Sequence, residues 1–206
     1  MSISNYGELK TQLNTYLFQQ RFISQYDNAT IKFERVVRRK LRVQPMEAVA
    51  TLTTIGGAVA LPSDYIKWRA VVYKGLTPFT TLDYVHPAYL ESSASVVVFT
   101  RPKVFTIEAS TFKARPIDDV AGRYELHYYQ KPTSLVGADG NMNWLLTEFP
   151  DLYEYGVLME LFKLARNREA AELYKAHRDE VFKEVKDHYA EAVNPSSILV
   201  RSADYF

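Results

Sequence analysis

The sequence predicts an α+β protein in which a helical bundle carries an inserted small antiparallel β sandwich or barrel and an extended C-terminal tail. Apolar residues recur at helical spacing near both ends of the 206-residue chain, while short strand-like runs and turn residues fill the middle. The bundle should combine an N-terminal helix pair with two C-terminal helices. We therefore expect a helical domain over residues 1–46 and 143–194, a β-rich domain over 47–132, a linker over 133–142 and a C-terminal arm over 195–206.

The N-terminal helix pair is indicated by capping and spacing. Asn5 followed by Glu8 resembles a capping box at the start of the first helix. The second helix lies in SQYDNATIKFERVVRRKLRV and ends before Pro45. Its apolar row is Tyr26, Ala29, Phe33, Val37 and Leu41.

The other side of this second helix is basic, with Lys32, Arg35, Arg38, Arg39 and Arg42. One interpretation is a phosphate-binding stripe, which would make residues 31–42 a DNA-binding module. The other is pairing with acidic helices through residues such as Glu154, Glu160 and Asp179. Residues 1–50 hold eight Lys/Arg against four Asp/Glu, and residues 147–193 hold seven against eleven. The net charge of +1 and the lack of interleaved aromatics favour pairing over DNA binding.

The middle of the chain predicts several short antiparallel strands. Gly56-Gly57 between two strand-like runs indicates a hairpin, and a second hairpin is expected around Ala109-Ser110. Residues 124–129 alternate in a way that is typical of a strand with one buried face. We expect the loops at Gly56-Gly57, Gly75–Pro78 and Ala109-Ser110 to carry contacts to partners.

The stretch DLYEYGVLMELFKLA (151–165) reads as part of a helix from about Glu148 to Arg166, capped by Asn143 or Thr147, with apolar residues on two sides. A surface helix needs only one apolar stripe. Either the helix lies at the centre of its own bundle, or its second stripe contacts a neighbouring copy. Gly156 within the helix suggests a close helix approach, which offsets its cost of about 1 kcal/mol relative to Ala. The two stripes are Leu152, Tyr155, Met159 and Phe162, and Tyr153, Val157, Leu161 and Leu164.

No motif in the sequence indicates catalysis, and we expect no enzyme activity, cofactor or metal. The run from Asp139 to Asn143 superficially resembles a calcium loop, but Trp144 and Pro150 stand where such a loop needs Gly and Glu. Carboxylates such as Glu91 or the pair Asp118-Asp119 could be nominated for glycoside hydrolysis, but the sequence gives no reason to single them out.

The composition predicts a soluble protein that is assembled in a reducing cytoplasm. The chain has no cysteine, which excludes a disulfide framework and fits a reducing compartment. Its start lacks the pattern of a signal peptide. No apolar run approaches the length of a membrane helix, so no membrane partner is expected.

Four stretches resemble the phage head–tail adaptor family, whose members dock beneath the portal of tailed bacteriophages. They are SNYGELKTQL, RRKLRVQPME followed by TLTT, ALPSDYIKWRAV, and NWLLTEFPDLYEYGVLME over residues 143–160. The last stretch is the most specific. The resemblance implies a virion neck protein, a ring of twelve copies that extends the portal's DNA channel, and a tail or nozzle protein attached below. In such a ring, the two stripes of residues 151–165 would contact the same subunit and its neighbour.

The final residues, SSILVRSADYF, are too apolar for a tail left in water. We expect this arm to be mobile in the free subunit and to order on docking to the portal. Ile198, Leu199 and Val200 suit addition to a sheet edge or groove. Arg201 could pair with a portal carboxylate, and Tyr205 and Phe206 could fill a pocket. The alternative is an arm packed on its own subunit or a neighbouring copy.

Overall fold

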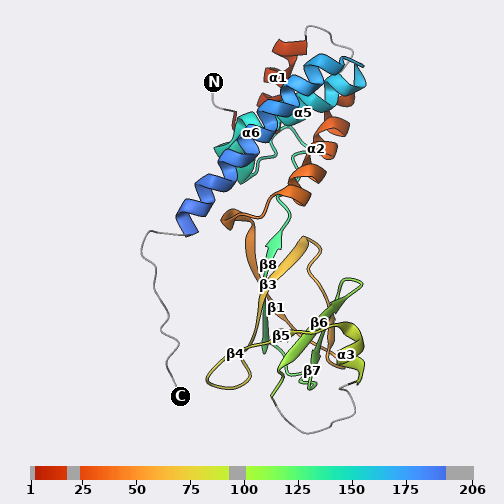
Figure 1. Ribbon diagram of the computed structural model, residues 1–206, viewed down its shortest axis with the longest axis vertical. Coiled ribbons are helices and arrows are strands. Elements are labelled where there is room, and N and C mark those ends of the chain that lie inside the picture. The colour runs from red at the N-terminus through yellow and green to blue at the C-terminus, as the bar shows by residue number, and fades with distance from the viewer. Residues whose placement is uncertain (1–2, 18–23, 93–100, 194–206) are drawn as a thin grey trace. The chain divides into compact units, whose positions relative to one another are not determined.

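The computed structural model describes residues 3–17, 24–92 and 101–193 and confirms the α+β class (Figure 1). The chain divides into two compact units. The helical unit contains residues 1–45 and 132–206, and the β unit contains residues 46–131. Each unit has its own core, so each is described by itself.

The helical unit is built around a central helix. Its helices are α1 (Tyr6–Leu17), α2 (Tyr26–Lys40), α4 (Trp144–Glu148), α5 (Pro150–Leu164) and α6 (Arg168–Val193). Helix α5 packs against each of the other four. Helical packing places fully buried side chains such as Leu9, Phe33 and Leu158 around it. The core of this unit therefore surrounds one helix.

The C-terminal helices begin and end at residues whose chemistry explains the boundaries. Asn143 caps α4, because its side chain accepts a hydrogen bond from Leu146 N at 2.9 Å. Pro150 disfavours helical geometry at Phe149 and has no N–H, so the helix expected from about Glu148 begins at Pro150 as α5, and α4 is a separate short helix before it. Arg166, with a φ of 59°, ends α5, and Asn167 caps α6 by accepting from Ala170 N.

The β unit is a sandwich of two four-stranded sheets among the described residues. One sheet has the order β1-β8-β3-β4 and the other β2-β7-β6-β5. A short helix, α3 (Pro87–Ser92), packs against β6. The strands are β1 (Glu47–Leu52), β2 (Ala58–Ala60), β3 (Tyr65–Tyr73), β4 (Thr80–Thr81), β5 (Asp83–Tyr84), β6 (Val104–Glu108), β7 (Thr111–Arg115) and β8 (Tyr124–Gln130).

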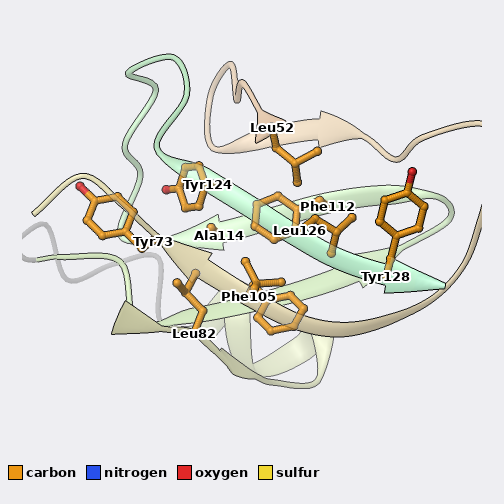
Figure 2. Close-up of a cluster of buried hydrophobic side chains, with 10 residues drawn as sticks. Leu52, Tyr73, Leu82, Phe105, Phe112, Ala114, Tyr124, Leu126 and Tyr128 are labelled. Atoms are coloured by element: carbon orange, nitrogen blue, oxygen red, sulfur yellow. The ribbon is translucent and has the colours of Figure 1, made fainter. Parts of the chain in front are cut away.

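Aromatic side chains from both sheets fill the space between them (Figure 2). Phe105 and Phe112 stack at 5.8 Å between ring centroids, and Tyr124 meets Phe112 edge-on at 5.6 Å. Trp68 stacks on Tyr84 at 5.6 Å. Alternation along β8 places Tyr124, Leu126 and Tyr128 on the buried face, as the sequence predicted.

Two details of the β unit differ from expectation. The sandwich is not wholly antiparallel, since β5 and β6 pair in parallel. The Gly56-Gly57 turn forms as predicted, because Ile55 and Ala58 pair antiparallel across two glycines with φ of 63° and 73°. The pairing stops at this bridge, since the strands on either side, β1 and β2, belong to different sheets. The Ala109-Ser110 hairpin is confirmed, because β6 and β7 pair antiparallel up to Glu108 and Thr111.

Candidate interaction surfaces

The two apolar stripes of α5 are covered almost entirely within the helical unit. Leu152, Met159, Tyr153, Val157 and Leu161 are at most 1% exposed. Tyr155 and Phe162 are half-buried beside Tyr174 of α6, with the Phe162 and Tyr174 rings stacked at 5.3 Å. Central burial therefore accounts for both stripes, and the inference of a neighbouring copy from the second stripe is corrected. Leu164, which is 42% exposed, is the member still accessible for such a contact.

Gly156 allows the close approach of α2 to α5. A Cβ atom at this position would lie 2.2 Å from the ring of Phe33. Phe33 also meets Tyr153 edge-on at 5.1 Å between centroids. The missing side chain thus makes room for a buried ring of the same subunit.

The basic face of α2 is open. Lys32, Arg35, Arg38 and Arg39 are exposed, and none of them forms a salt bridge within the described ranges. Arg42 is half-buried, and its Nη1 donates to the backbone oxygens of Arg38 and Leu41. The four exposed cations form a surface that we call the α2 basic stripe.

The acidic residues expected to pair with this stripe have other partners. Glu160 pairs with Lys163 at 3.1 Å, and Glu154 is buried with the Tyr16 hydroxyl as its donor. Asp179 pairs with Arg178 and, at 3.2 Å, with Lys40 at the end of α2. Pairing between α2 and an acidic helix is thus limited to Lys40, and the expectation that it neutralises the stripe is corrected.

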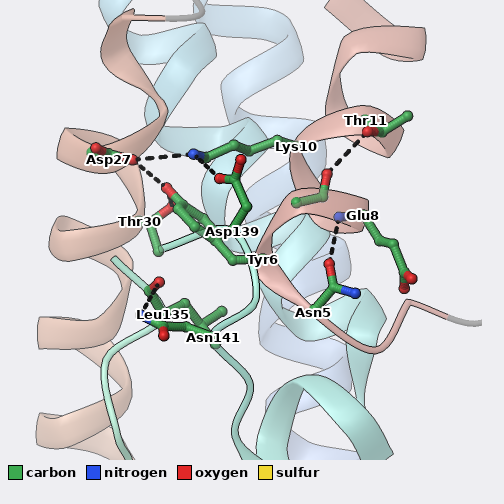
Figure 3. A network of polar contacts seen from close by, with 11 residues as sticks. Asn5, Tyr6, Glu8, Lys10, Thr11, Asp27, Thr30, Leu135, Asp139 and Asn141 are labelled. Carbon is green, nitrogen blue, oxygen red and sulfur yellow. Dashed lines mark hydrogen bonds and ion pairs between the residues drawn. The ribbon is translucent and has the colours of Figure 1, made fainter. Parts of the chain in front are cut away.

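Polar contacts around Asp139 hold the loop that precedes α4 against α1 and α2 (Figure 3). Lys10 lies 2.8 Å from Asp139 and 3.9 Å from Asp27, and Asp27 accepts from the Tyr6 hydroxyl at 2.7 Å. The backbone amides of Tyr6 and Gly7 donate to the backbone oxygens of Asn141 and Asp139. This network gives the stretch from Asp139 to Asn143, which superficially resembled a calcium loop, a structural role.

In the β unit, Asp119 organises the turn at Gly56-Gly57. Its two carboxylate oxygens accept from Gly56 N and Gly57 N, each at 2.8 Å, and the Gly57 amide holds the pKa of Asp119 below its usual value. Gly57 has a φ of +73°, and a Cβ there would meet Ile117 Cγ1 at 2.9 Å. Two loops distant in sequence are therefore joined at this turn.

Asp118 fixes the adjoining loop. Its Oδ2 accepts from Arg123 Nη1 at 2.7 Å and from the Tyr73 hydroxyl, and its Oδ1 accepts from Val120 N. Burial opposes ionisation, but these donors outweigh it and keep the pKa of Asp118 below its usual value. Both aspartates thus have structural partners, which explains their presence without catalysis.

The joined loops expose three apolar side chains, which we call the apolar turn cluster: Ile55 (84% exposed), Ile117 (52%) and Val120 (49%). The loop at Gly75–Pro78 likewise exposes Leu76 and the adjacent Phe79. Ala109 and Ser110 are exposed and take positive φ angles of 46° and 67°, as a tight hairpin turn requires. All three loops named from the sequence therefore carry accessible side chains.

Sequence reasoning missed Ile117 and Val120 of this cluster and an acidic stripe on α6. The cluster depends on contact between loops about 60 residues apart, which no local pattern reports. The acidic stripe, Glu180, Glu184 and Asp187, has helical spacing in the sequence and could have been found by removing the buried face of α6 first. The arm residues Ile198, Leu199, Val200, Arg201, Tyr205 and Phe206 lie outside the described residues.

Across residues 3–17, 24–92 and 101–193, no three or more His, Asp or Glu residues are grouped so that they could hold a metal ion. No helix in these same ranges is long and apolar enough to span a bilayer.

Two units with exposed charged and apolar surfaces suit the class of structural proteins that act by contact. Comparison with protein families agrees, because the model of the SU10 adaptor protein family matches residues 4–199. The chain belongs to this family of phage adaptors. It is therefore a virion component that contacts other virion proteins, and the family indicates a structural, non-enzymatic role. A search of curated proteins found no match.

Proposed function

We propose that this protein is the head-to-tail adaptor of a phage virion. In this proposal, copies form a ring of twelve beneath the portal, extend the channel through which genomic DNA passes without sequence-specific contact, and attach the tail or nozzle protein. Assembly takes place in the host cytoplasm. The observation that carries the proposal is the family match over residues 4–199, which includes both units.

The proposed portal contact is the C-terminal arm, and it is supported by the apolar sequence of residues 198–206. Deleting residues 196–206 should leave a folded, soluble protein that no longer attaches to portal. Circular dichroism would check folding, and co-sedimentation with purified portal would check attachment. Normal attachment of the truncated protein would rule out the docking arm.

The proposed tail contact is the β unit. Its support is the apolar turn cluster, which an organised pair of loops holds in an accessible position. Cross-linking in assembled particles should connect Ile55 or Phe79 positions to the tail or nozzle protein or to neighbouring copies. Cross-links from these positions to portal, with the arm linked to the tail, would reverse the proposed polarity.

A second candidate function is DNA binding through residues 31–42, and one observation favours it: the α2 basic stripe has no salt-bridge partner within the described residues. A dedicated DNA-binding module should bind duplex DNA tightly as an isolated protein, with affinity that falls steeply as salt increases. Weak binding over the same salt range would leave the structural adaptor as the function.

A further inference from the structure

The α2 basic stripe and the acidic stripe of α6 have matching spacings. In α2, the residues Lys32, Arg35 and Arg39 are separated by three and four positions. In α6, Glu180, Glu184 and Asp187 are separated by four and three. Each set extends over seven residue steps, or about 10.5 Å along a helix at 1.5 Å per residue. All six side chains are exposed, and no salt bridge engages them in the described parts of the chain.

The two stripes cannot meet within one subunit. Helix α2 turns Phe33 and Val37 towards α5, and Arg35 lies about 200° around the helix from Phe33. Helix α6 buries Phe182 and Val185, and Glu180 and Glu184 lie on its opposite side. Where the two helices meet, Lys40 pairs with Asp179 at 3.2 Å and the rings of Phe33 and Phe182 lie 6.2 Å apart, on the inner side of both stripes. A charged partner for either stripe would therefore come from another molecule.

We propose that the α2 basic stripe of one copy docks antiparallel on the α6 acidic stripe of the next copy. Opposite directions bring the spacings into register, with Arg39 facing Glu180, Arg35 facing Glu184 and Lys32 facing Asp187. The contact joins two different surfaces, so it repeats from copy to copy and closes when the rotation permits. This inference rests on the proposed ring and identifies one of its interfaces.

The charges would set the register and the choice of partner, while apolar area contributes to affinity. Isolated surface ion pairs add little, but complementary stripes suppress wrong pairings and speed encounter. Leu173 is 55% exposed two turns before Glu180, so in this register it lies beyond the end of α2 at Lys40 and is open to other parts of the neighbouring copy. Lys183 lies at the edge of the acidic stripe and faces none of the three basic residues in this register.

Duplex DNA is the competing occupant of the basic stripe. A second copy fits better because the same chain carries acidic residues at the complementary spacing, and because the net charge is only +1. DNA would leave the exposed acidic stripe of α6 without a partner.

Charge reversal separates the two occupants. One variant carries Arg35→Glu and Arg39→Glu, and the other carries Glu180→Lys and Glu184→Lys. Native mass spectrometry with purified portal should show that each variant alone loses ring assembly by at least about tenfold. An equimolar mixture should recover assembly with alternating variants, and all four changes in one chain should also recover it. A control variant with Lys67→Glu and Lys103→Glu makes the same change in net charge as the α2 variant, but on exposed residues of the β unit.

The results distinguish the possible failures. The α2–α6 contact is overturned if wild-type protein assembles and both variants assemble equally well, or if the mixture does not recover assembly. In either case the proposed ring itself still stands. If the α2 variant loses DNA binding and the α6 variant assembles normally, the α2 basic stripe is a DNA-binding surface. If wild-type protein forms no ring on portal, both the proposed function and this inference fail.

Cross-linking gives a second readout that does not depend on charge. The chain has no cysteine, so Arg35→Cys with Glu184→Cys introduces two defined thiols. A bis-maleimide reagent with a reach of about 8–10 Å, the distance between packed helix axes, should join neighbouring copies into a ladder. Arg35→Cys with Glu169→Cys, where Glu169 is exposed but several turns from Glu184, should not. Equal ladders from both pairs would contradict the register.

Discussion

Buried and half-buried acidic side chains have different environments in the helical and β units. In the helical unit, burial raises the pKa of Glu34 and Glu154, whose donors are uncharged: Ser134 Oγ and Leu135 N for Glu34, and the Tyr16 hydroxyl for Glu154. In the β unit, Asp118 accepts from a guanidinium as well, and its pKa is lowered despite burial. The identity of the donors decides the direction of the shift.

This difference corresponds to different structural roles. Glu34 joins α2 to the loop at Leu135, inside the helical unit. Asp118 and Asp119 instead fix loops that expose apolar residues at the surface of the β unit. In the helical unit, the exposed Glu8 has a lowered pKa because it accepts from the Ser4 backbone amide, and the half-buried Asp179 has a lowered pKa because Arg178 and Lys40 outweigh its burial. The donors therefore decide the shift in both units: neutral donors leave the cost of burial uncompensated at Glu34 and Glu154, whereas charged donors outweigh it at Asp118 and Asp179.

The largest effect is expected from a new acid on α5 that has no donor. Val157→Asp should lower the free energy of unfolding of the helical unit by about 4 kcal/mol or more, because Val157 is fully buried among apolar neighbours. Leu164→Asp, on the same helix but 42% exposed, should change it by no more than about 0.5 kcal/mol. Urea unfolding followed by circular dichroism measures both.

This pair also tests whether Leu164 contacts a neighbouring copy. A folded Leu164→Asp protein that fails to assemble on portal would support such a contact. Normal assembly and infectivity with Leu164→Asp would remove the last member of the second stripe from the interface. A Val157→Asp protein as stable as wild type would contradict the central position of α5.

In the β unit, removing the charge of Asp118 should be the most damaging single change to the loop. Asp118→Asn weakens charge-assisted hydrogen bonds from Arg123 and Tyr73, and should cost about 1–2 kcal/mol at pH 7. The pKa of Asp118 is lowered, so its stabilisation is present above the unfolded pKa and is lost as pH falls through the folded one. The variant should therefore approach wild type in strong acid. Asp83→Asn, on an exposed strand residue, is the matched control and should behave as wild type. Equal costs at pH 7 and in strong acid would contradict this account.

Sequence reasoning recovered the elements whose signals are local. The 3.6-residue period of α2, the alternation in β8 and the turn at Ala109-Ser110 are all patterns of neighbouring residues, and all three are confirmed. The turn at Gly56-Gly57 is present, but its pairing does not extend beyond Ile55 and Ala58, because turn chemistry does not specify which sheet the next strand joins. That choice depends on β7, which lies more than 50 residues later.

The candidate surfaces were less predictable because exposure is a tertiary property. The sequence identified both stripes of α5 but could not tell whether α2 and α6 or another copy would cover them. It identified the cations of α2 but assigned them partners that turned out to be occupied or buried. Only the packing of α5 shows which faces are left for other molecules.

Uncharged buried hydroxyls offer a smaller test of the same comparison. Thr30 in α2 is fully buried, and its Oγ1 lies 3.3 Å from the Tyr6 hydroxyl. Thr106 in β6 is equally buried, but the described residues offer its Oγ1 no hydrogen-bond partner. Thr106→Val should raise stability by about 0.5–1 kcal/mol, whereas Thr30→Val should lower it by a similar amount. Thermal unfolding of the two variants gives the comparison, and a stability loss in Thr106→Val would indicate a partner for that hydroxyl.

A similarly small effect should come from neutralising Glu154. Burial raises the pKa of Glu154, so the folded state holds its proton more tightly than the unfolded state does. The contribution of this group to stability is fully present below the unfolded pKa of about 4.3 and is lost as pH rises through the folded value. At pH 7 the buried charge is a cost, which Glu154→Gln removes while the amide oxygen can still accept from Tyr16. We expect the variant to be more stable than wild type by about 0.5–1 kcal/mol at pH 7, and by less at pH 4. Glu160→Gln, one and a half turns further along α5 and paired with Lys163, should give no gain at pH 7. A difference between Glu154→Gln and wild type that is the same at both pH values would show that the carboxylate is not penalised by its burial.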